Sequence, residues 1–288
     1  MSEINGGESL FRLVFQKLIS LKVVAFRFAL EVVKNRYMLK CLVLRDLKSR
    51  YTGSFIGVFW AVIHPIVTVI TYSYVFSFVM KIRLTPDAGT NNFLLWLLCG
   101  LAPWIYFSDT ILRNVNVLID NKMLITKSLF PSELLPLSIM LSNLLNHMIM
   151  FGIVGIVAIV IYKKITILIL YLPVYIFLLS LFGIGISWLV SSINIFFRDM
   201  GQILVVVINM WFFYTPIVYQ SSMVPENLRV LLRLNPMYYV VEGYRLSLLG
   251  IEHQHWKGML LLLVLGIISS IAGGFIFKRL KPDFAEML

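Results

Sequence analysis

The sequence predicts an all-α membrane protein with six transmembrane helices, an N-terminal amphipathic interface helix and short helices at the outer face. Apolar residues make up 59% of the 288 residues and charged residues only 14%, whereas a soluble domain needs about 25% charged residues to cover its surface. Six uncharged stretches are each long enough for a helix to cross about 30 Å of hydrocarbon. Barrel strands would be shorter and would alternate in polarity.

These stretches divide the chain into three regions. Residues 1–50 are expected to form a cytoplasmic and interfacial segment, 51–280 the six-helix transmembrane domain, and 281–288 a cytoplasmic tail. No compact apolar core of a cleavable signal peptide precedes the first span, which is therefore expected to act as the insertion signal. The predicted spans are 51–80, 88–108, 134–162, 165–197, 200–225 and 258–277.

Basic residues set the expected orientation. With the N-terminus inside, 17 Lys and Arg residues fall on the cytoplasmic side and 8 on the outer side. The positive-inside rule then predicts a multi-pass protein of the bacterial inner membrane with both termini in the cytoplasm. The formal net charge of +11 fits segments beside anionic membrane lipids, and no basic stripe of a nucleic-acid surface is present.

Residues 10–33 are predicted to form a helix that lies in the membrane interface. An apolar stripe with helical spacing runs through the segment, and Arg12, Lys17 and Lys22 lie off it. A soluble helix packed on a partner is the alternative. The stripe consists of Phe11, Val14, Phe15, Leu18 and Ile19. Residues 34–50 remain basic and polar, as expected for the cytoplasmic approach to the first span.

The outer segment 221–257 is expected to contain two short helices. One begins near Pro225, and the other runs from the N-cap Asn235 and the first helical residue Pro236 to the terminator Gly250. The second helix has an apolar face, so we expect it to re-enter the membrane or to pack against the ends of the spans. That face consists of Met237, Val240, Val241, Tyr244 and Leu248.

The sequence contains no motif for catalysis. It lacks a phosphate-binding loop, a serine nucleophile elbow and a His-Glu-x-x-His helix. The two cysteines, Cys41 and Cys99, are expected to be free thiols. Glu252, His253 and His255 in the last outer loop favour a solvated turn over a metal site. We therefore expect no catalytic residue, metal or cofactor in this chain.

The predicted spans contain polar side chains but almost no charge. The strongly polar residues are His64, Asn143, Asn146, His147, Asn194 and Asn209. Three of them, Asn143, Asn146 and His147, share one helical face, which favours hydrogen bonds between helices. An ion-coupled carrier normally carries ionisable residues within its spans. The energy for any transport is therefore expected to come from elsewhere.

Aromatic residues in three spans are candidates for a substrate path. Their faces suit the C–H faces of sugar rings, and contact with lipid is the alternative. The candidates are Trp60, Tyr72, Trp104, Tyr106, Phe107, Trp211, Phe212, Phe213 and Tyr214. The last four directly precede Thr215 and Pro216, where a helix is expected to kink.

Four sequence segments carry a resemblance to a known family. They are LVLRDLKSRYTGSFIGVFWAVIHPI (Leu42–Ile66), Gly100–Ser138, INIFFRDMGQILVVVINMWFFYTPIVY (Ile193–Tyr219) and LNPMYYVVEGYRLSLLG (Leu234–Gly250). In order and spacing these resemble the membrane (permease) subunits of ATP-binding-cassette exporters for bacterial polysaccharides. That family includes permeases for lipopolysaccharide O-antigen, teichoic acid and capsule. Residues 1–35 are longer than the family pattern.

The resemblance implies that two copies form a channel and that two separate ATPase subunits dock on the cytoplasmic face. ATP and Mg²⁺ would then bind in the partner, and the cargo would be a glycan on undecaprenyl pyrophosphate, with O-antigen as the first candidate. Teichoic acid or capsule, a drug or another lipid, and a membrane-embedded glycosyl transferase remain as alternatives. The transferase would need an acidic site from Asp109, Asp120 and Asp199, which form no cluster in the sequence.

The resemblance also assigns three sets of residues. Arg45, Asp46, Lys48, Arg50 and Tyr51 would form a cytoplasmic entrance whose cations hold a pyrophosphate, with lipid head-group anchoring as the alternative. A coupling loop at 113–133 would place Val115, Leu118, Ile119 and Ile125 against the ATPase. The outer gate at 221–257 would include Pro225, Pro236, Tyr238, Glu242 and Arg245.

Overall fold

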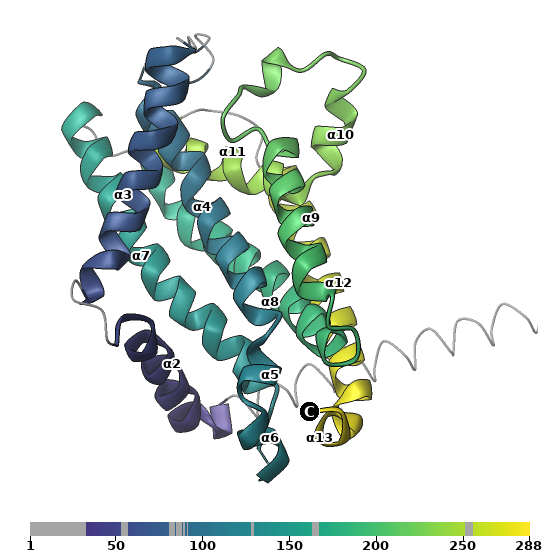
Figure 1. The fold of residues 1–288 in the computed structure, drawn as a ribbon. Helices are drawn as coiled ribbons and strands as arrows, with labels where there is room; N and C mark the ends of the chain where they lie inside the picture. Colours follow the sequence, from purple (N-terminus) through teal and green to yellow (C-terminus); the bar gives the residue numbers. More distant parts are fainter. Residues whose placement is uncertain are drawn as a thin grey trace, which may run out of the picture.

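The fold is a bundle of helices with small helices at both ends. A computed structural model describes residues 33–52, 57–80, 84, 88, 90, 92–127, 130–162, 167–250 and 256–288. These residues form helices and turns without a strand, which confirms the predicted all-helical class. Figure 1 shows α2, α5, α6 and α13 at one end and α10 and α11 at the other. We call these the α2 end and the α11 end.

Four helices in the described part of the chain are long and apolar enough to cross a membrane. They are α4 (Phe93–Asn114), α7 (Leu134–Tyr162), α8 (Leu172–Phe196), which follows the 3₁₀ turn η4 (Ile167–Tyr171), and α12 (Trp256–Leu280). Two shorter apolar helices occupy the first and fifth predicted spans. They are α3 (Trp60–Ser73), continued by the π-helical η2 (Tyr74–Val79), and α9 (Met200–Tyr214). Among the described residues, length and composition thus support four of the six predicted crossings, and the count of six stays a prediction.

The α9 helix stops where a kink was expected. Thr215 has extended backbone angles, φ −100° and ψ 132°, because the ring of Pro216 disfavours a helical conformation in the residue before it. The Thr215 hydroxyl donates to the carbonyl of Trp211 (2.9 Å). The rest of the predicted span, up to residue 225, therefore forms non-helical chain and the short 3₁₀ helix η5 (Ser221–Met223) at the α11 end.

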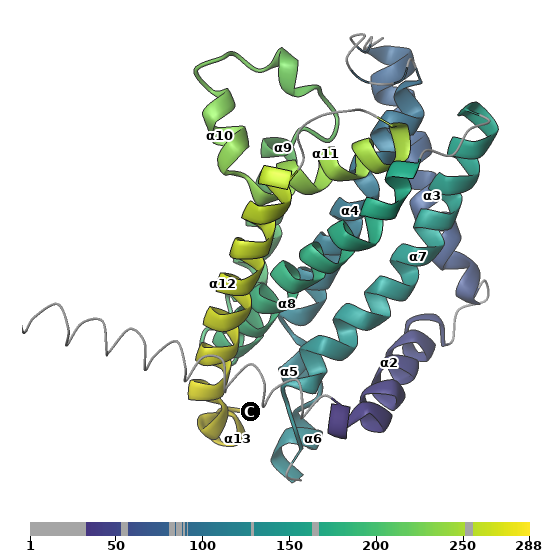
Figure 2. The ribbon, with the colours of Figure 1, turned by 180° about the vertical axis from the view of Figure 1, so that it is seen from behind.

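The basic residues before the first span form the helix α2 (Arg36–Tyr51). It buries Leu39, Leu42 and Val43, and it lies alongside α7 in both Figure 1 and Figure 2. The predicted interface helix at 10–33 lies almost entirely outside the described residues, as does the loop with Glu252, His253 and His255.

Close packing of α8 on α12 depends on glycine. A Cβ atom on Gly185 would come within 2.2 Å of the Ser269 backbone, and one on Gly273 within 1.9 Å of the Gly185 carbonyl oxygen. The hydroxyls of Ser269 and Ser270 donate to carbonyls of α8 (3.2 and 2.7 Å). Small residues let helices approach in lipid, where burial of apolar surface drives no association.

The C-terminal residues close the α2 end of the bundle. Phe284 in α13 (Phe284–Met287) is fully buried, and its ring lies 5.2 Å from that of Phe277. Lys281 forms an ion pair with Glu133 (2.6 Å) at the start of α7. Residues 281–288 therefore pack against the bundle, where we expected a simple tail.

The second predicted outer helix is confirmed as α11 (Pro236–Leu249). Asn235 caps it by accepting from the Met237 amide (3.0 Å), and Gly250 ends it with φ 74°. Its predicted apolar face is buried except for the half-buried Leu248, because the helix lies across α4, α8 and α12 (Figure 2). The first predicted outer helix begins later than Pro225, as α10 (Arg229–Leu234).

Candidate functional site

Three helices meet in an ion cluster near the α2 end. Asp46 of α2 accepts hydrogen bonds from Arg50 of the same helix (3.0 Å) and from Arg113 of α4 (2.5 Å). It also accepts from the Ser142 hydroxyl of α7. Asn143 of α7 accepts from both arginines, at 2.5 and 3.1 Å. We call these five residues the Asp46 cluster.

The Asp46 cluster carries a net positive charge, because two guanidinium groups share one carboxylate. The Asp46 side chain is only 12% exposed, so its bonds are largely shielded from water, and charge-assisted bonds are strong there. The amide nitrogen of Asn143 completes the network by donating to Thr110 (3.2 Å). The cluster thus holds α2, α4 and α7 together at one level of the bundle.

A polar cavity of about 300 Å³ lies next to the Asp46 cluster, between α3, α4 and α7. The α4 residues in its wall recur at helical spacing, from Ala102 to Arg113, and so do the α7 residues from Asn143 to Met150. One face of each helix therefore lines it. The polar and aromatic lining residues are Arg50, Trp60, His64, Tyr106, Asp109, Arg113, Asn143, Asn146 and His147.

Two charged residues lie inside an apolar helix where few were expected. The predicted second span ended at residue 108, but α4 continues to Asn114 and includes Asp109 and Arg113. Both side chains line the cavity. The sequence did contain this signal, since the two residues are one helical turn apart and directly follow an apolar run.

Of the three residues predicted to form hydrogen bonds between helices, Asn143 and His147 do so. Asn143 belongs to the Asp46 cluster. His147 shares a hydrogen bond with the Tyr244 hydroxyl of α11 (2.9 Å) and contacts the Ala102 carbonyl of α4. Asn194 of α8 donates to the Val115 carbonyl (2.9 Å). Asn146 and His64 line the cavity, whereas Asn209 is exposed on α9.

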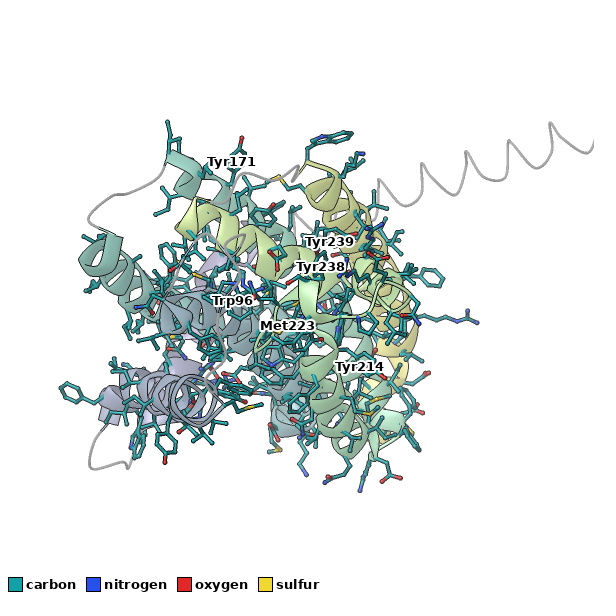
Figure 3. All side chains as sticks on the ribbon, turned by 90° about the horizontal axis from the view of Figure 1, so that it is seen from above. Trp96, Tyr171, Tyr214, Met223, Tyr238 and Tyr239 are labelled. Carbon is teal, nitrogen blue, oxygen red and sulfur yellow. The ribbon has the colours of Figure 1, made fainter. Side chains whose placement is uncertain are left out.

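Two of the predicted outer-gate residues, Glu242 and Arg245, form an ion pair at the α11 end. Arg245 of α11 is 1% exposed, pairs with Glu242 (2.8 Å), donates to the Ile217 carbonyl (3.1 Å) and lies 3.5 Å from the ring centre of Trp96. Figure 3 shows Trp96 and Tyr238 from the α11 end. Partial burial raises the pKa of the Tyr238 phenol, so it stays a neutral donor. Of the two predicted prolines, Pro225 is exposed and Pro236 begins α11.

The predicted aromatic path divides into buried and exposed residues. Trp104, Tyr106, Phe107 and Phe212 are buried among the helices, and the rings of Phe107 and Trp211 meet edge to face at 5.3 Å. Tyr72 and Trp211 are half-buried. The exposed members are Trp60, Phe213 and Tyr214. Of the nine, only these three are exposed, and the role of all nine in a path stays a prediction.

A second cavity of about 460 Å³ lies between α9 and the short helices of the α11 end. Trp211 and Tyr214 line it together with apolar residues of α10. The Trp211 indole nitrogen donates to Asn235 (2.9 Å), whose amide donates to Thr215 (2.9 Å). One asparagine thus caps α11 and fixes the end of α9.

The predicted entrance residues do not form one group. Asp46 and Arg50 are paired with each other in the Asp46 cluster, whereas Arg45 and Lys48 are exposed. Arg45 donates to Asn121 (2.5 Å), which lies between α5 (Val117–Asp120) and α6 (Lys122–Lys127). The side chain of Tyr51 lies outside the described part of the chain.

The predicted coupling stripe needs correction. Val115 and Leu118 are buried in the chain's own core, Leu118 with no exposure at all, because α5 folds back against α7 and α8. They cannot contact a partner in this conformation. Ile119 and Ile125 are half-buried, and Met123 of α6 is 55% exposed. The accessible apolar surface of 113–133 therefore centres on α6.

Comparison with known proteins adds an independent finding. A family model described as ABC-2 type transporter matches residues 37–249. The O-antigen export system permease protein of Myxococcus xanthus is 28% identical over 91% of this chain and 99% of its own length. One from Klebsiella pneumoniae is 29% identical over 85% and 92%. The polysialic acid transport protein of Escherichia coli is 25% identical over 72% and 80%.

Proposed function

This chain belongs to the family of ABC-2 type transporters, and we propose that it is the channel-forming permease subunit of a polysaccharide exporter in the bacterial inner membrane. The observation that carries the proposal is the match to an O-antigen export permease over 99% of that protein's length. Because such a match leaves no domain of the relative uncovered, O-antigen is the first choice of cargo.

The energy source in this proposal is a separate ATPase. The sequence has no phosphate-binding loop, so hydrolysis of ATP with Mg²⁺ would take place in a partner subunit. Two ATPase subunits would dock at the α2 end, where α6 presents Met123. The ion pair of Lys281 with Glu133 places the C-terminus at the same end, which would face the cytoplasm together with the N-terminus.

The proposed cargo carrier is undecaprenyl pyrophosphate, and two copies of the chain would enclose its path. Arg45 and Lys48 are the exposed entrance cations, so they are better placed than Arg50 to meet a pyrophosphate. The exposed rings of Trp60, Phe213 and Tyr214 would lie on surfaces that a second copy and the glycan share.

Capsular polysaccharide is the second candidate cargo. The polysialic acid transport protein of Escherichia coli covers less of the chain and is less similar than the O-antigen permeases. Its match to 72% of this chain nevertheless favours the same fold with another glycan.

The test is complementation with this chain and its candidate ATPase partner. A strain without its own O-antigen permease should regain surface O-antigen when it receives both proteins. It should stay deficient when the ATPase carries an inactive phosphate-binding loop. A capsule-deficient strain receives the same pair in parallel. Restored capsule without O-antigen would change the cargo, and ATPase activity of the purified chain alone would contradict the proposal.

A further inference from the structure

One carboxylate in the polar cavity takes part in none of the ion pairs around it. Asp109 is exposed to the cavity, and among the described residues no donor or cation lies within hydrogen-bonding distance of its oxygens. The electrostatic field of His64 of α3 acts on it, and both side chains line the cavity. A carboxylate within a membrane-spanning helix is costly without a partner, and such residues mark functional sites. This one lacks a cation.

The opposite charge is in excess one helical turn away. Arg113 follows Asp109 at the next turn of α4, about 6 Å along the helix axis, and lines the same cavity as Arg50. These two arginines share the single carboxylate of Asp46, so one positive charge remains uncompensated. Of the further ionisable side chains that line the cavity, His147 is hydrogen-bonded to Tyr244 and Tyr106 to Ser180.

The cavity therefore presents separated charges of both signs. A purely anionic ligand would satisfy the arginines and leave Asp109 without a partner. An uncharged sugar would compensate neither charge. The ligand that fits carries a phosphate and an ammonium group joined by a short linker, and a membrane supplies this chemistry as phosphatidylethanolamine.

We propose that this cavity binds the zwitterionic head group of phosphatidylethanolamine. The ammonium group donates to Asp109, and the phosphate accepts from Arg113 at the edge of the Asp46 cluster. The exposed ring of Trp60 borders the ammonium position. Ala102, Ile105 and Met150 supply the apolar part of the cavity wall.

The volume of the cavity agrees with this ligand. About 300 Å³ is at the lower end of the range of ligand pockets, which suits a head group whose acyl chains remain in the bilayer. The bound lipid would bridge α3 to α4 and α7. This inference depends on the membrane location of the chain and not on the identity of the exported polysaccharide.

The test is native mass spectrometry of the purified full-length chain with three probes at pH 8. The probes are dioctanoyl phosphatidylethanolamine, dioctanoyl phosphatidylglycerol and phosphoethanolamine without acyl chains. We expect the ethanolamine lipid to bind about tenfold or more tightly than the glycerol lipid, from the loss of one charge-assisted bond. Phosphoethanolamine should not displace it at equal concentration.

The variant Asp109→Asn should abolish this preference, because the remaining cations then favour the anionic lipid. Asn is close in size, and Asp109 makes no bond that the fold needs. The matched control is Asp199→Asn, which removes the same charge from an exposed position outside the cavity. Equal binding of both lipids to the unmodified chain, or equal behaviour of the two variants, would overturn the proposal. If phosphoethanolamine displaces the lipid, the ligand of the cavity is a soluble molecule and the lipid proposal is wrong. The lipid-binding test is independent of whether the chain restores polysaccharide export.

Discussion

Asp46 in α2 accepts two hydrogen bonds from Arg113 in α4, 67 positions further along the chain, at 2.5 and 3.2 Å. This pair links the helix that precedes the first span to the helix that carries the cavity wall. Because α2 and α6 lie at the same end of the bundle (Figure 1), movement of a partner at that end would reach α4 through this pair.

Asp46→Asn should destabilise the chain, because it leaves Arg50 and Arg113 without their counter-ion in a poorly solvated position. We expect a loss of about 3 kcal/mol in the free energy of unfolding. Thermal unfolding in detergent measures it. The control is Glu226→Gln, whose side chain is 90% exposed and 3.7 Å from Arg229, and which should change stability by less than about 0.5 kcal/mol. Equal shifts for both variants would refute the structural role of the cluster.

Met123→Asp and Leu118→Asp should separate docking from folding. Met123 is exposed on α6, so a charge there should leave the chain stable and weaken co-purification of the ATPase. Leu118 is fully buried, so an unpaired carboxylate there should cost about 4 kcal/mol or more and lower the amount of folded chain. If Met123→Asp retains the ATPase fully, the docking surface is not on α6.

Tyr214→Ala and Phe213→Ala should slow export without loss of folded protein, because both rings are exposed on α9. Each stacking contact with a sugar is worth about 1 kcal/mol, so single changes should be modest and the double change larger. The readout is surface polysaccharide normalised to membrane protein. Phe275→Ala on α12, also exposed, is the control. If the control slows export equally, the α9 aromatics do not line the substrate path.

Gly273→Ala should destabilise the contact between α8 and α12, because its Cβ would overlap the Gly185 carbonyl. The helices would have to separate, at a cost in the range of overpacked cores, about 1–3 kcal/mol. Gly152→Ala in α7 has no atom within 4 Å of the new Cβ and should be neutral or stabilise by about 0.5–1 kcal/mol. The unfolding temperatures of the two variants, measured in the same detergent, test this difference in stability.

Local rules in the sequence were enough for α11 and for the end of α9. Asn235, Pro236 and Gly250 act on backbone groups within a few residues, and Pro216 acts on the residue before it. The sequence also placed Asn143 and His147 on one face of a helix. Which helices that face would meet, α2, α4 and α11, could not be predicted, because the partners lie about 30 to 100 residues away.

The sequence by itself determined that this chain is an all-helical membrane protein, because apolar runs of sufficient length leave the backbone no other way to satisfy its hydrogen bonds in lipid. Only the tertiary structure decided which charges are paired. Asp46 and Asp109 both stand beside arginines in the sequence or on the helix, yet Asp46 joins three helices and Asp109 remains open to a cavity. That difference arises because burial and pairing depend on how α2, α3, α4 and α7 pack.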